Sequence, residues 1–307
     1  MTGAREASGL LPEEPGVYRF RDERGRVAYV GRATNLRVRV RSYWGDLADR
    51  PWLRRMTGQI DAVEVIVCAS AHEAAWLERN LLERSLPRWN RLRGGTETPA
   101  WLVVDAGPRS PGLQLVFEPP SDQMAAFGPY LGFERTSLAR DALLRLYPLQ
   151  LTGSRPTAAD RALAEARAVS PADREEFARR LRAVLGRDRT ATAEAAAGLL
   201  AARDRAVARL AFETAEQVHR ELAALDWLVA DQRVTGCVPA DLAVVGWADG
   251  TQFSLTATLG RLDRWTVREA DEPAGRAASA RTPGHWREFA LRNAELSAVL
   301  ADAQRSH

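Results

Sequence analysis

The stretch PGVYRFRDERGRVAYVGRATNLRVRVRSYW, residues 15–44, decides the fold. Two short segments in which apolar and polar residues alternate, GVYRFRD (16–22) and RVAYVGR (26–32), lie on either side of a turn-like tetrapeptide, DERG, that ends in glycine. Alternation with a period of two is typical of strands, and such a tetrapeptide is typical of a hairpin turn. The stretch therefore predicts a β-hairpin that places Tyr18 and Tyr29 on paired strands.

The residues after the hairpin predict a short helix that runs to about Tyr43. Thr34 or Asn35 can cap its N-terminus. The apolar positions that would share one face are Leu36, Val40 and Tyr43. The alternation RVRVR (37–41) is also compatible with a strand, but the cap and the apolar spacing favour a helix. On that helix Arg39 and Tyr43 are four residues apart, so both side chains leave the same side.

Arginine supplies every basic side chain other than histidine, because the chain contains 43 Lys and Arg residues and none of them is lysine. The net charge is only +3, but eight arginines lie between Arg19 and Arg41 against two acidic residues, Asp22 and Glu23. Guanidinium groups are planar, forked donors that suit phosphate. The stretch is therefore either an arginine-rich surface hairpin or the floor of a phosphate-binding site, and the charge pattern alone leaves both open.

The composition is that of a soluble globular protein in a reducing compartment. At 307 residues, with 46% hydrophobic and 27% charged residues, the chain is long enough for two or three domains. No apolar run approaches the roughly 18 residues of a membrane span, and the N-terminus lacks a signal-peptide core. Cys68 and Cys237 are far apart and have no metal-ligand companions. We expect a cytoplasmic protein without disulfides or zinc.

A third strand is predicted at 63–69 and a helix at 71–85, stopped by Pro87. Glu78 lies within the apolar stripe of that helix. A carboxylate at the edge of a core costs several kcal/mol unless it is paired or binds a cation. Glu78 therefore predicts either an arginine partner from the neighbouring helix or a ligand for a hard divalent cation.

The rest of the chain alternates between β and α patterns. Residues 94–156 contain two apolar strands, AWLVVDA and LQLVFE, and then FGPYLGFERTSLARDALLRLYPL, which predicts a turn followed by a helix. Residues 157–230 are helical by pattern, with breaks near Ser170 and Gly186. The apolar residues at helical spacing from Val207 to Leu225 predict a helical hairpin or a coiled coil. Residues 231–307 predict a β-hairpin around Asp249-Gly250 and a final helix near 285–303.

The order of these motifs resembles the GIY-YIG endonuclease family. GVY is followed after ten residues by YVG, then by ATNLRVRVRSYW, a helix carrying a glutamate, and PRWN. Within that family the wording is most similar to the N-terminal half of UvrC-like nucleases of bacterial nucleotide excision repair, in LPEEPGVYRFRDERGRVAYVGRATNLRVRVRSYW and in EAAWLERNLLERSLPRWN. The segments FGPYLGFERTSLARDALLRLYPL and VARLAFETAEQVHRELAAL resemble later parts of the same nucleases, the second being similar to the UVR motif.

This resemblance implies an α+β fold and a domain order. It predicts a small GIY-YIG nuclease domain with a three-stranded antiparallel sheet and helices over 10–93, and a UvrC-like α/β extension over 94–156. A helical region follows over 157–230, with a UVR-like hairpin at about 196–230. The last segment, 231–307, would be a truncated C-terminal β/α segment of unknown role, similar to the opening strands of an RNase H-type domain. A plain two-helix packing unit remains the alternative to the UVR-like hairpin.

The resemblance also implies roles for single residues. The implied catalytic residues are Tyr18, Tyr29, Arg32, Arg39, Tyr43, Glu78 and Asn90, and the implied DNA-binding residues are Gly31, Arg32, Arg37 and Arg41. Tyr29 would act as the general base, with nearby cations, Arg32 and the metal, favouring its phenolate. Glu78 would hold a single Mg²⁺ or Mn²⁺ ion, and Arg39 would neutralise the phosphate. Gly31 would let the backbone approach the substrate.

One position departs from the family pattern: Arg32 stands where UvrC-like sequences usually have lysine. An arginine at this position would hold charge near the site but would not exchange a proton.

The implied function is a metal-dependent DNA endonuclease that makes the 3′-side incision in nucleotide excision repair. Its substrate would be damaged or distorted double-stranded DNA, and UvrB would be its partner through the UVR-like hairpin. Because the sequence ends at His307, it is most similar to a short, Cho-like UvrC homologue. The alternatives are a catalytically weakened accessory protein that binds DNA and UvrB, and a defence or mobile-element nuclease, against which the UVR-like hairpin argues.

Overall fold

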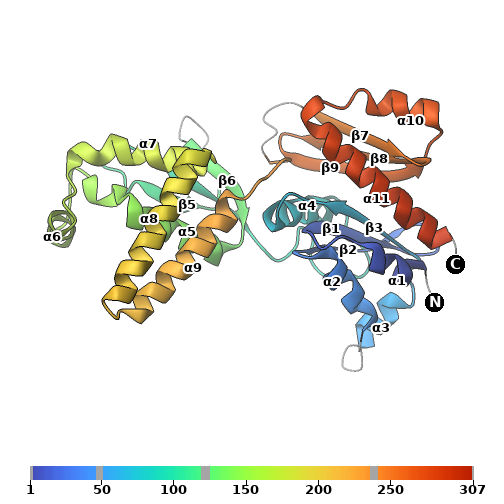
Figure 1. The fold of residues 1–307 in the computed structure, drawn as a ribbon, viewed down its shortest axis with the longest axis horizontal. Helices are drawn as coiled ribbons and strands as arrows, with labels where there is room; N and C mark the ends of the chain where they lie inside the picture. The colour runs from blue at the N-terminus through green and yellow to red at the C-terminus, as the bar shows by residue number, and fades with distance from the viewer. Residues whose placement is uncertain (1–2, 46–50, 119–124, 236–240, 306–307) are drawn as a thin grey trace. The chain divides into compact units, whose positions relative to one another are not determined.

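A computed structural model describes residues 3–45, 51–118, 125–235 and 241–305 (Figure 1). The chain divides into two compact units. Unit 1 comprises Met1–Thr96 together with Asp231–His307, and unit 2 comprises Glu97–Ala230. Cys237 lies outside the described residues, whereas Cys68 is a buried free cysteine. In the described part of the chain, no helix is both long and apolar enough to cross a membrane.

The N-terminal part of unit 1 contains the predicted three-stranded antiparallel sheet. Strands β1 (Gly16–Arg21), β2 (Val27–Ala33) and β3 (Ala62–Val67) are arranged in the order β2-β1-β3. The β1–β2 turn is closed by the Asp22 carboxylate, which accepts hydrogen bonds from the backbone N–H groups of Arg24 and Arg26. Tyr18 at the centre of β1 is paired with Gly31 on β2. The predictions of the hairpin and of the third strand are confirmed.

The predicted helices are also present. Helix α2 (Leu36–Arg41) is capped by Asn35, whose side chain accepts from the Val38 N–H at 3.0 Å, and one 3-10 turn, η2 (Ser42–Trp44), continues it. Helix α4 (Ala71–Arg84) is capped by Ser70 and ends before Pro87. The sequence analysis missed the helices α1 (Gly3–Ala7) and α3 (Pro51–Thr57) and the 3-10 turn η1 (Ser8–Leu10).

The C-terminal part of unit 1 contains a second three-stranded antiparallel sheet. Its strands are β7 (Leu242–Ala248), β8 (Thr251–Thr258) and β9 (Arg261–Glu269), followed by α10 (Glu272–Ser279), η5 (Gly284–Trp286) and α11 (Arg287–Arg305). The predicted hairpin around Asp249-Gly250 is confirmed, but β9 and α10 were not predicted. Leu259 forms the second tight turn with Gly260, and both residues have positive φ angles. Leucine rarely adopts that conformation, so the residue types alone do not indicate this turn.

This C-terminal part packs directly on the first sheet (Figure 1). Val17 and Ile66 from the first sheet share one hydrophobic core with Phe253, Leu255 and Phe289. Helix α11 also covers the free edge of β3. The Asn293 side chain accepts a hydrogen bond from the Val67 N–H at 2.9 Å, and the Gln304 side chain accepts one from the Val63 N–H at 2.7 Å. These side chains satisfy an edge that would otherwise expose unpaired backbone groups.

A buried ion pair strengthens the same contact. Arg19, only 5% exposed, projects from β1 and is paired with Glu64 on β3. Its guanidinium group also donates to the Trp265 carbonyl at 2.9 Å and lies 3.8 Å from the centre of the Trp265 ring. The charge therefore has a carboxylate, a carbonyl and an aromatic face around it, which is what a buried arginine requires.

Unit 2 has a core of its own, formed by a third sheet and a set of helices. Strands β4 (Pro99–Val104), β5 (Leu113–Val116) and β6 (Ala125–Leu131) are arranged in the order β5-β4-β6. The predicted turn at FGPYL is wrong, because this segment belongs to β6. Pro129 has no N–H to donate, and it lies where the β4–β6 pairing shifts register, a position at which a strand tolerates proline.

The helices of unit 2 follow the sequence pattern more closely. They are α5 (Phe133–Leu146), η3 (Leu149–Thr152), α6 (Ala158–Ala166), η4 (Pro171–Asp173), α7 (Arg174–Leu185), α8 (Arg189–Ala208) and α9 (Phe212–Val229). The predicted breaks near Ser170 and Gly186 are confirmed. Helices α8 and α9 form a hairpin rather than a continuous apolar helix, because Leu210 has a positive φ angle in the turn and is 74% exposed.

Candidate active site

Three tyrosines from three different elements meet on one face of the first sheet. Tyr18 comes from β1, Tyr29 from β2 and Tyr43 from η2, and their ring centres are 5.9–6.2 Å apart. The hydroxyl groups of Tyr18 and Tyr43 are hydrogen-bonded at 2.7 Å. Tyr18 and Tyr43 are buried, whereas Tyr29 is half-buried. Tyr29 is therefore the tyrosine of this cluster whose hydroxyl is best placed to meet a substrate from solvent.

Gly31 makes room for this cluster. A methyl group added at Gly31 would lie 2.6 Å from Cζ of Tyr18 and 2.9 Å from Cε1 of Tyr29, and it would also overlap the Tyr18 hydroxyl. The glycine faces Tyr18 across the hairpin. The missing side chain thus leaves space for two tyrosine rings. The expectation that Gly31 also lets the backbone approach the substrate stays a prediction.

Burial raises the pKa of all three tyrosines above the ordinary value. For Tyr29, the neighbouring Tyr43 and the Glu78 carboxylate raise the pKa further, while the Arg39 guanidinium opposes them. We had expected Arg32 to be the protein cation that favours the Tyr29 phenolate. Arg39 has that position instead, since Arg32 is paired with Glu78.

Glu78 projects from α4, and its carboxylate is 3.4 Å from Nε of Arg32 on β2. The side chains of Glu78 and Arg32 are 21% and 32% exposed, so the pair lies at the rim of the core. The expected arginine partner is therefore present, but it comes from a strand and not from a neighbouring helix. The separation is longer than the roughly 2.7–2.9 Å of a strong charge-assisted hydrogen bond.

Glu78 is the carboxylate near the tyrosine cluster that we expected to hold a metal ion. Within them, no group of three or more His, Cys, Asp or Glu residues is close enough together to hold one. Magnesium usually keeps several of its waters and is bound through one or two carboxylates. Glu78, partly buried at the rim and close enough to Tyr29 to affect its pKa, fits that type of site.

Asn90 holds the edge of the sheet. Its side chain accepts from the Val30 N–H at 2.9 Å and donates to the Val30 carbonyl at 2.8 Å, which continues the pairing of β2. The adjacent Trp89 N–H donates to the Ala28 carbonyl at 3.1 Å. The amide of Asn90 therefore positions the strand that carries Tyr29. The catalytic role expected for Asn90 stays a prediction.

The arginines predicted to bind DNA have different environments. Arg37 donates to the Leu11 carbonyl at 2.6 Å and is paired with Glu13 at 2.8 Å, so its side chain fastens the N-terminal segment. Arg39 and Arg41 are exposed, and Arg39 lies 5.2 Å from the centre of the Tyr43 ring. Arg37 therefore has a structural partner and Arg41 faces solvent, while the guanidinium group of Arg39 reaches the tyrosine cluster and interacts with Tyr18.

The sequence analysis missed a second group of arginines on the same side. Arg54 and Arg55 are exposed on α3, and Arg88 and Arg91 are exposed on the segment after α4. The described residues 35–45 and 51–58 contain no acidic side chain. The arginines in and around PRWN could have indicated this group from the sequence. Only the fold shows that these arginines lie beside those of α3.

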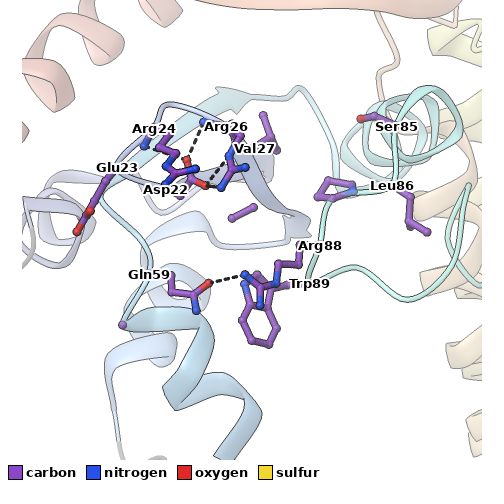
Figure 2. Close-up of a pocket in the computed structure, with 13 residues that line it drawn as sticks. Asp22, Glu23, Arg24, Arg26, Val27, Gln59, Ser85, Leu86, Arg88 and Trp89 are labelled. Atoms are coloured by element: carbon purple, nitrogen blue, oxygen red, sulfur yellow. Dashed lines mark hydrogen bonds and ion pairs between the residues drawn. The ribbon is translucent and has the colours of Figure 1, made fainter.

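A hollow of about 760 Å³ lies at the start of β2 (Figure 2). It is formed by the β1–β2 turn, by Gly58 and Gln59, and by the segment 85–89. Figure 2 shows the Arg88 side chain beside Trp89 and extended toward Gln59, 3.5 Å from its side-chain oxygen. The catalytic candidates are absent from its lining, so the hollow neighbours the tyrosine cluster rather than containing it.

Residues 14–91 match the family model of the UvrC-like GIY-YIG domain. These residues include every catalytic candidate from Tyr18 to Asn90. The chain therefore carries, over these residues, a domain of the UvrC-like GIY-YIG type. The observed mixture of antiparallel sheet and helices confirms the predicted α+β class.

The similarity to curated proteins points to UvrABC system protein C. The protein of that name from Symbiobacterium thermophilum is 31% identical over 294 residues, which cover 89% of this chain and 46% of the relative. The Mycobacterium leprae protein is 40% identical over 146 residues, which cover 47% of this chain and 22% of the relative. The chain thus spans about half the length of the first of these relatives. These similarities do not favour the alternative of a weakened accessory protein.

A solved structure is also similar over the N-terminal domain. It is the GIY-YIG N-terminal endonuclease domain of UvrC from Thermotoga maritima, bound to its catalytic magnesium. It is 37% identical, the match covers 28% of this chain and 94% of that domain, and the TM-score is 0.26.

Proposed function

We propose that the protein is a divalent-metal-dependent DNA endonuclease that hydrolyses a phosphodiester bond and makes the 3′-side incision of nucleotide excision repair. The observation that carries the proposal is the meeting of Tyr29, Arg39 and Glu78 at one rim of the sheet. Arg39 lies 5.2 Å from the centre of the Tyr43 ring, which is 5.9 Å from the Tyr29 ring, and Glu78 is paired at 3.4 Å with Arg32 on the strand that carries Tyr29. Tyr29, Arg39 and Glu78 are a candidate base, a candidate phosphate clamp and a candidate metal ligand.

Arg39 supplies the positive charge that a reacting phosphate needs. Its guanidinium group is partly buried against the tyrosine cluster, and α2 has no acidic residue to neutralise it. A fixed cation at the position where charge develops lowers the barrier without reorganisation during the reaction. The arginine can therefore bind the scissile phosphate and stabilise the transition state.

Tyr29 is the candidate for activating the attacking water. Tyr29 is the half-buried residue of the three, and the buried Tyr18 and Tyr43 pack against its ring. Because burial raises the Tyr29 pKa, removal of its proton needs compensating positive charge at the rim. Arg39 provides one such charge. A divalent ion held by Glu78 would provide the other when DNA is bound.

Glu78 is the residue that would hold the Mg²⁺ or Mn²⁺ ion. Bound there, a divalent ion would supply charge that offsets the negative charge on the phosphate and on the leaving oxygen. Arg32 neutralises the carboxylate across 3.4 Å. We propose that Arg32 keeps Glu78 oriented at the rim, a role that lysine could also fill as a point charge.

The DNA backbone would lie across the arginines of α2, α3 and the segment after α4. Within the described part of the chain, Arg41, Arg54, Arg55 and Arg91 form no ion pair with a carboxylate. Each phosphate that such a group neutralises releases counterions and makes the affinity dependent on salt. Damaged or distorted duplex DNA is the proposed substrate.

We further propose that UvrB binds at the tip of the α8–α9 hairpin. Val207, Leu210 and Phe212 are 45%, 74% and 63% exposed there, and together they form an apolar tip. Apolar side chains gathered on an otherwise charged surface are typical of a protein-binding site. Leu210→Asp should abolish capture of the protein by immobilised UvrB, whereas Leu163→Asp, at an exposed leucine on α6, should leave capture unchanged.

The central test is Glu78→Gln. The protein is incubated with UvrA, UvrB, Mg²⁺ and a lesion-bearing duplex, and the incision position is read on a sequencing gel. We expect wild-type protein to nick on the 3′ side of the lesion, and Glu78→Gln to bind the DNA normally without nicking it. Glu83→Gln, on the same helix, is the matched control and should still nick. Divalent-dependent nicking by Glu78→Gln would contradict the metal assignment.

Arg39→Ala tests the phosphate clamp in the same assay. We expect kcat to fall at least about 100-fold, as when one preorganised transition-state donor is removed, with DNA affinity changed only a few-fold. Arg41→Ala is the comparison and should weaken binding without lowering kcat. Arg32→Lys should nick within a few-fold of wild type, and a large gain with lysine would show that Arg32 limits activity.

A further inference from the structure

Trp52 is a large aromatic side chain that is exposed to solvent and not packed into the core. All nine tryptophans of the chain lie in the described residues, and among them Trp52 alone is classed as exposed, at 41%. Its neighbours Leu53 and Met56 are buried in the same core as Tyr18 and Tyr43. Helix α3 is therefore fixed by its inner face, and that orientation holds the Trp52 ring in solvent.

Arg91 stands beside this ring. Its guanidinium carbon is 5.9 Å from the centre of the Trp52 ring. Within the described part of the chain, Arg91 has no hydrogen bond or ion pair from its side chain. Because Arg91 follows Asn90, whose amide is bonded to the backbone of Val30, its backbone is anchored to the edge of the sheet. An aromatic face and an unneutralised planar cation are thus held next to each other.

The pair lies at the rim of the candidate active site. Helix α3 contacts η2, the turn that carries Tyr43. Arg91 is one residue from Asn90, which holds the strand segment adjacent to Tyr29. Further along the same edge, Arg88 lies over the Trp89 ring at 5.4 Å, at the hollow shown in Figure 2. The segment after α4 therefore contributes two arginines that each lie over a tryptophan ring.

We propose that Trp52 and Arg91 form a subsite for one unpaired base of the DNA strand next to the scissile phosphate. The base would stack on the Trp52 ring, and Arg91 would bind the adjoining phosphate. The inference rests on the proposed endonuclease function. It adds that the site selects DNA with an unpaired nucleotide next to the scissile phosphate. In a fully paired duplex both faces of each base are stacked on neighbours, so only an unstacked nucleotide can use the ring.

The test measures DNA binding in the Glu78→Gln background, so that the substrate stays intact. Two labelled duplexes of the same sequence are compared at one salt concentration, one fully paired and one with a single unpaired nucleotide. Trp52→Ala should weaken binding of the second duplex roughly 5- to 150-fold, the effect of one base stacked on an aromatic ring. Trp52→Phe should retain most of the affinity, and the fully paired duplex should be affected less than two-fold or so.

Arg91→Ala should weaken binding of both duplexes and lower the slope of log Kd against log salt by about one. Its matched control is Arg135→Ala, since Arg135 lies 5.8 Å from the Trp227 ring in unit 2. A direct readout is 2-aminopurine at the unpaired position. Its fluorescence should be quenched by the protein that has Trp52 and not by Trp52→Ala.

Two outcomes would overturn the subsite. In both, the Trp52→Ala variant has the same thermal transition as the Glu78→Gln protein from which it is made. In the first outcome it binds the duplex with the unpaired nucleotide as tightly as that protein does. In the second it loses the same affinity for both duplexes. In either case wild-type nicking would leave the endonuclease proposal standing. Absence of both DNA binding and nicking in the wild-type protein would instead refute the endonuclease proposal and the subsite with it.

Discussion

At the scale of single residues, the candidate site depends on space as much as on charge. Tyr18 and Gly31 face each other across the hairpin, and the glycine leaves room for the rings of Tyr18 and Tyr29. Tyr18 is fully enclosed, so its ring cannot move aside without disturbing the core around it. The geometry of the cluster is therefore fixed by a position that carries no side chain.

Gly31→Ala should destabilise the protein. The added methyl group overlaps Tyr18 and approaches Tyr29, and forcing extra volume into a packed core costs about 1–3 kcal/mol. Urea denaturation should show that loss in the free energy of unfolding. Gly9→Ala is the control, because a methyl group there meets no atom within 4 Å. Equal stability of Gly31→Ala and wild type would show that the rings are not packed as described.

Tyr18→Phe should change both the stability and its pH dependence. Near neutral pH the variant loses the 2.7 Å hydrogen bond to Tyr43, worth about 0.5–1.5 kcal/mol. Burial raises the folded-state pKa of Tyr18, so the wild-type tyrosine contributes stability below its ordinary pKa of about 10 and loses it as pH rises further. The difference between the two proteins should therefore shrink above about pH 10. A difference that grows with pH would contradict the raised pKa.

At the scale of elements, the sequence patterns predicted the helices and strands whose caps, turns and apolar spacing lie within a few residues. The β1–β2 hairpin, α2 and α4 have their caps, turn residues and apolar spacing within a few residues, and all three were predicted. Strand β9 and strand β6 were not, because their identity depends on pairing with strands elsewhere in the chain. In the candidate site, the tyrosines and Glu78 follow from motif spacing. The Arg32–Glu78 pair and the Trp52–Arg91 pair require the fold, since each joins residues 39 or more positions apart.

Helix α11 acts as the cover for the edge strand β3, and Asn293→Ala should show what that cover contributes. The substitution leaves the buried Val67 N–H without its acceptor, which costs about 1–3 kcal/mol. The loss should appear in urea denaturation and in faster hydrogen exchange at Val67. Glu295→Ala, at an exposed position of the same helix, should have little effect. Unchanged exchange at Val67 would show that Asn293 is not its acceptor.

At the scale of the whole molecule, the two ends of the chain build one unit around the candidate site. Residues 231–307 contribute a sheet and a helix that pack in one core with β1 and β3. They also supply the Trp265 carbonyl, which accepts a hydrogen bond from the buried Arg19. Glu73 on α4 accepts hydrogen bonds from the backbone N–H groups of Arg233 and Val234. The helix that carries Glu78 is therefore fixed by residues more than 150 positions away. The C-terminal segment, which had no predicted role, is a structural part of unit 1 together with the GIY-YIG domain.

The organisation predicts that unit 1 can fold and nick DNA without unit 2, but not without its own C-terminal segment. Ser70 at the start of α4 is bonded to the Asp231 carbonyl, and Arg79 further along α4 is bonded to the Gly94 carbonyl. The two anchoring residues are nine positions apart along α4, so the ends to be joined are roughly 14 Å apart at about 1.5 Å per residue. A Gly/Ser linker of about 12 residues spans that distance.

A chain of residues 1–96, this linker and residues 231–307 should unfold in one cooperative transition and retain divalent-dependent nicking of naked DNA by the wild-type sequence. Residues 1–96 alone should aggregate or unfold, because Val17 and Ile66 lose the partners of their core and the β3 edge is uncovered. Thermal unfolding followed by circular dichroism compares the two. If residues 1–96 alone melted cooperatively at the same temperature as the linked chain, the C-terminal segment would be an appendage of the nuclease domain and not part of it.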